Sequence, residues 1–210
     1  MLGDLPHGRH ARPLLLFLVL LLPLPAGAEP TFEALAARAH ALKSLRSFLE
    51  SYVGECTDPF ERAPCEANAR RIRSELTGKL LRVRLPDAHG RLFRVVRELR
   101  GGRLQMVLTP FFGAGGYGLA ARRPKGTDAR GNPRVALLPF RIRLPEGMGR
   151  RDLERMLSTG NARIELLFRP RKVFTLRRRR GGPVRGVQAK LVGVRIRDRR
   201  SDRLAVEHLF

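Results

Sequence analysis

The 210-residue chain has no tryptophan, two tyrosines and two cysteines. Two cysteines are too few for a zinc site or an iron–sulfur cluster built on cysteine ligands. With no tryptophan and so little tyrosine, the chain offers few stacking platforms for the bases of a single-stranded nucleic acid. A membrane β-barrel also needs aromatic residues, which form girdles at its two membrane interfaces, and this chain has no tryptophan and only two tyrosines to form them. Composition therefore excludes cysteine-built metal centres and disfavours these two binding classes.

Acidic residues and histidines are scarce as well. Nineteen Asp and Glu stand against 42 Lys and Arg, which gives a formal net charge of +23 and an isoelectric point near 11.7. Beyond residue 28 only His40, His89 and His208 remain, and their spacing fits no metal site. No spacing singles out a pair of carboxylates, and no G-x-S-x-G nucleophile motif is present. The sequence therefore disfavours an enzyme and indicates no catalytic residue, no metal and no cofactor.

An export signal is the clearest local pattern. Basic residues in the segment 8–12 precede an apolar run over 14–22, and Ala26-Gly27-Ala28 follows as an A-x-A cleavage site. The run is much shorter than the roughly 20 residues that a spanning helix needs. We therefore expect residues 1–28 to be a cleaved signal peptide, with no integral membrane span left afterwards. The expected location is secreted, in the periplasm.

The expected compartment indicates the oxidation state of Cys56 and Cys65. An exported chain meets an oxidising environment, in which two nearby cysteines most simply form one disulfide. The C-x-x-C spacing typical of redox-active pairs is absent. We therefore predict a structural Cys56–Cys65 disulfide.

Two periodicities divide the mature chain. Apolar residues recur every three or four positions over 31–53 and 64–76, which predicts a helical hairpin within 29–77, stapled by the disulfide. From residue 78 to 210 the period changes to two, with one short helix near 150–158. The predicted strands are 79–85, 91–98, 103–109, 135–144, 162–168, 172–177, 187–197 and 203–209. The predicted fold is α+β, with the hairpin packed on a mainly antiparallel β-barrel or sandwich.

Arginine clusters are the first candidate for function. The densest is Arg177, Arg178, Arg179 and Arg180, and Arg195 and Arg197 stand at alternate positions of a predicted strand. Guanidinium groups bind phosphate and carboxylate in pairs, and a strongly positive surface attracts polyanions. We therefore expect these six arginines to bind an anionic envelope polymer or lipid. Nucleic acid is the weaker alternative, and it leads only if the chain is not exported.

A glycine-rich segment is the second candidate. Gly113, Gly115, Gly116 and Tyr117 precede Arg122 and Arg123. A glycine-rich backbone with flanking cations can cradle a phosphate, although the segment matches no P-loop pattern.

An outer-membrane β-barrel is the remaining alternative. The predicted strands carry apolar residues on one side and arginines on the other, and Leu204, Val206 and Phe210 resemble a terminal barrel strand. His208 breaks that alternation, and the strands are shorter than the roughly 9–11 residues that a membrane strand needs. A soluble, non-catalytic binding protein therefore remains the leading interpretation. The sequence leaves the oligomeric state open.

One further pattern is a resemblance. The leader, the helix at 31–53, the segment 58–65 (DPFERAPC) and the arginine-rich β region together resemble uncharacterised secreted proteins of myxobacteria and similar high-GC Gram-negative bacteria. The resemblance implies a domain of unknown function. It carries over no activity and no functional residue.

Overall fold

The computed structural model describes residues 29–56, 58–129, 131–177 and 182–210. The predicted signal peptide, and Arg178, Arg179 and Arg180, lie outside the described residues. No helix in the described part of the chain is long and apolar enough to cross a membrane.

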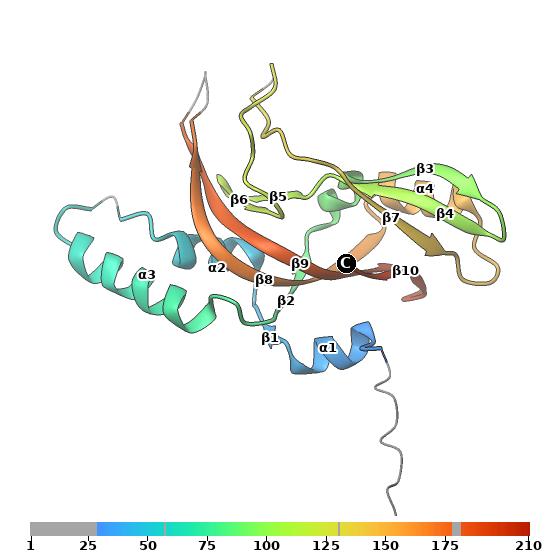
Figure 1. Ribbon diagram of the computed structural model, residues 1–210, viewed down its shortest axis with the longest axis horizontal. Coiled ribbons are helices and arrows are strands. Elements are labelled where there is room, and N and C mark those ends of the chain that lie inside the picture. The colour runs from blue at the N-terminus through green and yellow to red at the C-terminus, as the bar shows by residue number, and fades with distance from the viewer. Residues whose placement is uncertain (1–28, 57, 130, 178–181) are drawn as a thin grey trace, which may run out of the picture.

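Two β-sheets face each other across the core (Figure 1). Sheet A has the strand order β1-β2-β8-β9-β6-β5, and β10 also pairs with β9. Its strands are β1 (His40–Ala41), β2 (Leu81–Leu85), β5 (Phe111–Ala114), β6 (Tyr117–Ala120), β8 (Ala162–Leu176), β9 (Val184–Asp198) and β10 (Leu204–Leu209). Sheet B consists of β3 (Phe93–Leu99), β4 (Arg103–Leu108) and β7 (Leu138–Arg143), in the order β3-β4-β7.

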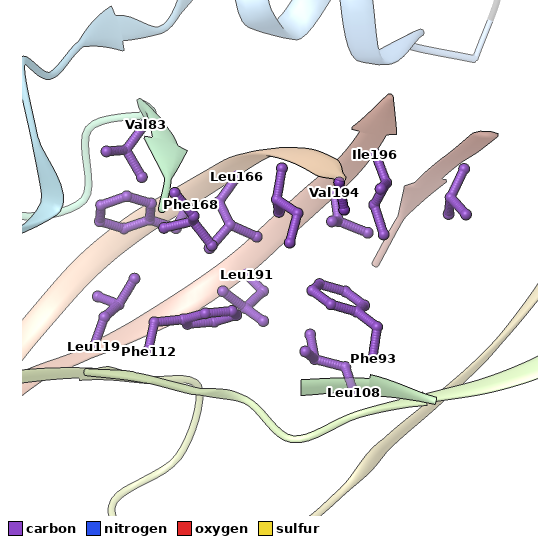
Figure 2. Packing of buried hydrophobic residues seen from close by; sticks show 14 of the residues in the cluster. Val83, Phe93, Leu108, Phe112, Leu119, Leu166, Phe168, Leu191, Val194 and Ile196 are labelled. Carbon is purple, nitrogen blue, oxygen red and sulfur yellow. The ribbon is translucent and has the colours of Figure 1, made fainter. Parts of the chain in front are cut away.

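The core lies between the inner faces of the two sheets. Alternate residues of each strand point inward because successive side chains of a strand lie on opposite faces. Figure 2 shows Phe168 and Val194 of sheet A on one side of the core, and Phe93 and Leu108 of sheet B on the other. The short 3-10 helix η1 (Asp87–Leu92) leads into β3, and α4 (Arg150–Ser158) packs against β3 and η1.

The two sheets do not close into a barrel. Sheet B ends at β3 on one side and at β7 on the other, and neither strand pairs with a strand of sheet A. The expected barrel is therefore wrong, and the sandwich alternative describes the arrangement. The mixed α and β content and the predominance of antiparallel pairs are confirmed, with parallel pairs only between β1 and β2 and between β6 and β9 among the described strands.

The helix predicted over 31–53 is instead two helices, α1 (Phe32–Arg38) and α2 (Leu45–Val53). Leu167 and Phe168 are neighbours on β8 and point to opposite faces of sheet A. The α1 helix packs against Leu167 on the outer face, whereas α2 packs against Phe168 on the inner face. The chain must therefore pass around the sheet edge, and β1 makes this passage by pairing with β2.

The helical hairpin is formed by α2 and α3 (Arg62–Leu76), not by the whole of 31–76. The Cys56–Cys65 disulfide joins the segment after α2 to the first turn of α3, with 5.7 Å between the Cα atoms. The prediction of this disulfide is confirmed. It fits a protein that resides in an oxidising compartment.

The strand predictions also need correction in two respects. The strands predicted at 162–168 and 172–177 are one strand, β8, because the register shift near Pro170 lets the antiparallel pairing with β9 continue past the proline. The strands β5 and β6 were not predicted at all, since glycines interrupt their alternation. The helix expected near 150–158 is confirmed as α4.

Candidate functional site

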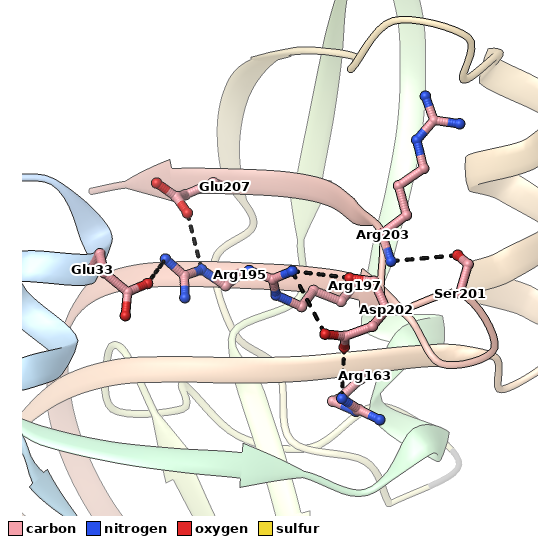
Figure 3. A network of polar contacts seen from close by, with 8 residues as sticks. All are labelled: Glu33, Arg163, Arg195, Arg197, Ser201, Asp202, Arg203 and Glu207. Carbon is pink, nitrogen blue, oxygen red and sulfur yellow. Dashed lines mark hydrogen bonds and ion pairs between the residues drawn. The ribbon is translucent and has the colours of Figure 1, made fainter.

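The outer face of sheet A carries a network of ion pairs centred on Arg195 (Figure 3). Arg195 is 8 % exposed, and its guanidinium lies 2.7 Å from Glu33 of α1 and 2.9 Å from Glu207 of β10. The same guanidinium stacks over the ring of Phe32, 4.3 Å from the ring centre. Arg195 therefore holds α1 and β10 against β9, and its donors are committed to the protein itself.

The pKa values of this network agree with that structural role. A hydrogen bond from Arg195, together with its charge, lowers the pKa of Glu33. Burial lowers the pKa of Arg195, but the hydrogen bonds and charges of Glu33 and Glu207 outweigh it and raise the value overall. Both groups are thus charged at neutral pH, and each neutralises the other.

Three further arginines of this face are paired in the same way, whereas the exposed Arg84 forms no ion pair with a described residue. Arg163 and Arg197 approach Asp202 at 2.7 and 3.9 Å, and Arg82 approaches Glu165 at 3.5 Å. These side chains, with Arg84, border an open hollow of about 300 Å³ beside α1. Because three carboxylates lie inside the hollow, an incoming anion would have to displace existing ion pairs.

Of the six arginines expected to form one anion-binding face, the three that the structure describes lie in two separate places. Arg195 is opposite Glu165, whereas Arg177 follows Leu176 at the far end of β8. The twelve residues from Glu165 to Arg177 span roughly 40 Å along the strand at about 3.3 Å per residue. Arg177 is exposed, but it does not share a surface with Arg195 and Arg197.

The glycine-rich candidate is a tight hairpin turn between β5 and β6. Ala114 pairs with Tyr117, and Gly115 and Gly116 have φ of +59° and +89°. Two successive positive φ values are what a two-residue hairpin turn requires, which explains the glycines without any ligand. Gly113 lies within β5 and pairs with Gly118.

The side chains around this turn also have partners within the protein. The hydroxyl of Tyr117 donates to Glu55 at 2.9 Å, and Glu55 also pairs with Arg185 at 2.7 Å. Arg122 and Arg123 are exposed and follow β6. The structure therefore gives the turn a structural explanation, while the two arginines stay open to solvent.

The outer face of sheet B is different. Register places five arginines on it, all exposed, and we call this set the arginine face: Arg94 and Arg97 of β3, Arg103 of β4, and Arg141 and Arg143 of β7. In the described part of the chain none of the five forms an ion pair. Their guanidinium groups are therefore not neutralised by a carboxylate of the described residues.

Strand register brings these arginines close together. Arg97, Gln105 and Arg141 form one row across the three strands, in which Arg97 donates to Gln105 Oε1 at 2.6 Å. In the next row Arg103 lies directly opposite Arg143. Like charges in directly opposite positions destabilise a sheet, and neighbouring strands are only about 4.8 Å apart. The outward positions of β3, β4 and β7 contain no Asp or Glu that would relieve this repulsion. The one acid of these strands, Glu98, is exposed on β3, but its register is that of the buried Leu104 on the inner face.

Sequence reasoning overlooked this face, although part of its signal was visible. Arg141 and Arg143 alternate with apolar residues, as do the arginines near 82 and 195. The sequence does not state which strands are neighbours. Only pairing reveals that β8 and β10 bring Glu165 and Glu207 to sheet A, whereas β3, β4 and β7 bring no outward acid to sheet B.

No metal-binding arrangement is found among the residues that the structure describes. They contain no group of three or more His, Cys, Asp or Glu side chains that could hold a metal ion. His89 is 8 % exposed, and its ring nitrogens lie 3.2 Å from the carbonyl oxygens of Pro86 and Gly113. Burial lowers the pKa of His89. This histidine therefore links η1 to β5 inside the protein.

Comparison with known proteins identifies the family. Residues 11–207 match a family of unknown function (DUF6066), and the chain belongs to it. No curated protein and no solved structure matches the chain.

Proposed function

We propose that this protein is a non-catalytic binding protein that holds an anionic polymer or lipid on its arginine face. The observation that carries the proposal is the concentration of five exposed arginines on a three-stranded sheet whose outward positions include no carboxylate. Guanidinium groups bind phosphate and carboxylate through two parallel hydrogen bonds. An extended polyanion could engage several of the five at once.

The energetic cost of the arrangement supports the same proposal. Arg103 and Arg143 repel each other across the strands, and a bound anion would remove that repulsion. An exposed strand position needs a polar side chain, but a mixture of acids and bases would satisfy that need equally well. Sheet A has such a mixture, so the fold does not require an outer face with arginine alone.

The compartment belongs to the proposal as well. The leader over 1–28 and the Cys56–Cys65 disulfide together favour export to the periplasm, where anionic envelope lipids and glycans are the abundant polyanions. Expression with the native leader tests this part. The proposal requires that the intact mass equal that of a chain beginning at Glu29, less the two hydrogens lost on disulfide formation. A full-length chain with two free thiols would contradict export.

A pair of variants with equal charge tests the binding surface. One variant replaces Arg94, Arg97, Arg103, Arg141 and Arg143 with Gln. The control replaces five exposed arginines that form no ion pair and lie on other elements: Arg62, Arg122, Arg123, Arg171 and Arg177. Binding to long-chain polyphosphate is measured at low and at high salt.

The first variant should bind on the order of 100-fold more weakly, whereas the control should lose less than about ten-fold. Wild-type binding should also weaken steeply as salt rises. Equal losses in both variants would mean that only total charge matters. A larger loss in the control would place binding outside sheet B, on a surface that includes some of the sequence-predicted candidates, Arg177 or Arg122 and Arg123.

A further inference from the structure

Exposed apolar side chains accompany the arginines of sheet B. Val96 is the extra residue of a bulge in β3 and is 50 % exposed, and Leu137 immediately precedes β7 and is 47 % exposed. Pro139 is exposed on the arginine face itself, opposite the half-buried Val107. Sheet B therefore presents apolar and cationic groups together.

The other large exposed apolar residues lie elsewhere, and the ring of Phe210 packs against Phe140 and His208. Phe60 is 95 % exposed, but it follows Asp58 and precedes Glu61 in the disulfide loop. Val173 lies on β8, and Phe210 follows β10. Scattered exposed apolar residues are normal on a protein surface and need no partner. The combination on sheet B is different because the apolar side chains lie on or beside the strands that carry the five arginines without ion pairs.

A soluble polyanion would satisfy the arginines but would offer nothing to Val96 and Leu137. An anionic bilayer satisfies both groups. Its phosphates accept hydrogen bonds from guanidinium groups, and its headgroup region accepts apolar side chains a few ångströms below. Arginine is well suited to this boundary because its methylene stem packs on apolar surface while its charged end stays at phosphate level.

The occupant of this surface can therefore be named. We infer that the arginine face docks on the surface of an anionic phospholipid bilayer, with the arginines on lipid phosphates and with Val96, Leu137 and Pro139 in the headgroup region. This inference rests on the proposed function, since it requires the same arginines. It adds the partner: a membrane surface rather than a dissolved polymer.

The absence of tryptophan allows a direct test, because a single introduced tryptophan reports from one place only. Val96→Trp puts the probe on sheet B, and Val173→Trp puts a matched control on a 42 % exposed position of β8. Each protein is mixed with vesicles of phosphatidylcholine alone or of phosphatidylcholine with phosphatidylglycerol. Emission from Val96→Trp should shift to shorter wavelength only with the anionic vesicles, and emission from Val173→Trp should stay unchanged.

A second pair of variants separates the inference from the proposed function. Val96→Ser with Leu137→Ser removes the apolar groups and keeps every arginine, and Phe60→Ser with Val173→Ser is the control. Loss of these two apolar contacts with the headgroup region should weaken binding to anionic vesicles about ten-fold. Binding to soluble polyphosphate should stay unchanged. The control should change neither. Circular dichroism and thermal unfolding confirm that each variant is folded.

The outcomes are distinct. If the Ser variant binds both probes as the wild type does, while the five-Gln variant loses both, the face binds polyanions and membrane docking is wrong. If the five-Gln variant keeps both, the proposed function and the docking inference fail together. Equal binding to vesicles with and without phosphatidylglycerol would overturn the role of charge. An unshifted Val96→Trp emission on bound anionic vesicles would show that another surface touches the lipid.

Discussion

The outer faces of the two sheets both carry arginines, but they differ in how many of those arginines are paired with a carboxylate. Both present arginines at alternate positions of their strands. On sheet A each of Arg82, Arg163, Arg195 and Arg197 approaches a carboxylate, and the pairs fix α1 and β10 in place. On sheet B the five arginines lack such partners in the described part of the chain. Arginines therefore stabilise the fold at the outer face of sheet A, whereas at the outer face of sheet B they are available to bind an anion.

The difference teaches that a count of arginines does not locate a binding surface. Arg195 and Arg197 stand in the most basic part of the sequence, yet their guanidinium groups are occupied by Glu33, Glu207 and Asp202. The arginines with the least internal competition lie on β3, β4 and β7. Availability depends on which acids the fold brings near, because a paired guanidinium must lose its partner before it binds another anion.

The largest expected effect on stability comes from removal of the Arg195 side chain. Arg195→Ala leaves Glu207 without its ion pair and Phe32 without the stacked cation, so we expect about 2 kcal/mol of lost unfolding free energy. Arg141→Ala is the matched change on sheet B and should cost less than about 0.5 kcal/mol, because no internal contact is lost. Chemical denaturation of both variants measures the contrast. Equal destabilisation would refute the division of roles between the two faces.

A smaller change converts sheet B toward the character of sheet A. Gln105 lies between Arg97 and Arg141, so Gln105→Glu places a carboxylate in the centre of the arginine face. Cross-strand pairs of opposite charge should raise the unfolding free energy by about 0.5–1 kcal/mol. The same carboxylate should weaken binding of polyphosphate or anionic vesicles by about ten-fold, since it competes for the arginines.

Opposite signs for stability and binding are the diagnostic result of that change. Gln105→Met is the control, because it alters the polarity of the side chain but adds no charge, and it should leave polyanion binding within about two-fold of the wild type. A Gln105→Glu protein that binds as tightly as the wild type would place the binding surface elsewhere.

The sequence predicted the elements of this protein better than their pairing. Alternation located most strands, and the cysteine spacing identified the disulfide, because both signals are local. The split of the first helix was visible in part: Ser44 accepts a hydrogen bond from the amide of Ser47 and begins α2 as an N-cap. The reason for the split was not visible, since it depends on α1 and α2 packing on opposite faces of sheet A.

The arginine face could not be predicted from the sequence for the same physical reason, which is that it depends on strand pairing. The arginine face is assembled from three strands, and its lack of acid follows from the neighbours that each strand receives. The glycines at 115 and 116 illustrate the opposite error, in which the sequence suggests a binding site and the structure gives the residues another role. Their pattern suggested a phosphate cradle, but the two positive φ values that they supply are needed by the turn between β5 and β6.

The smallest expected effect concerns acid. The hydrogen bond and charge of Arg195 lower the pKa of Glu33, so the stabilisation from this pair is present above the ordinary carboxyl value of 4.5 and is lost as pH falls through the lowered value. Glu33→Gln should therefore make the acid loss of unfolding free energy shallower. Arg141→Ala should keep the wild-type slope, because sheet B has no carboxylate whose protonation breaks a contact with that arginine. Denaturant midpoints collected from neutral pH downward compare the slopes. A Glu33→Gln slope as steep as that of the wild type would mean that carboxylates elsewhere dominate acid sensitivity, and that the Arg195 pair holds α1 mainly through its packing on Phe32.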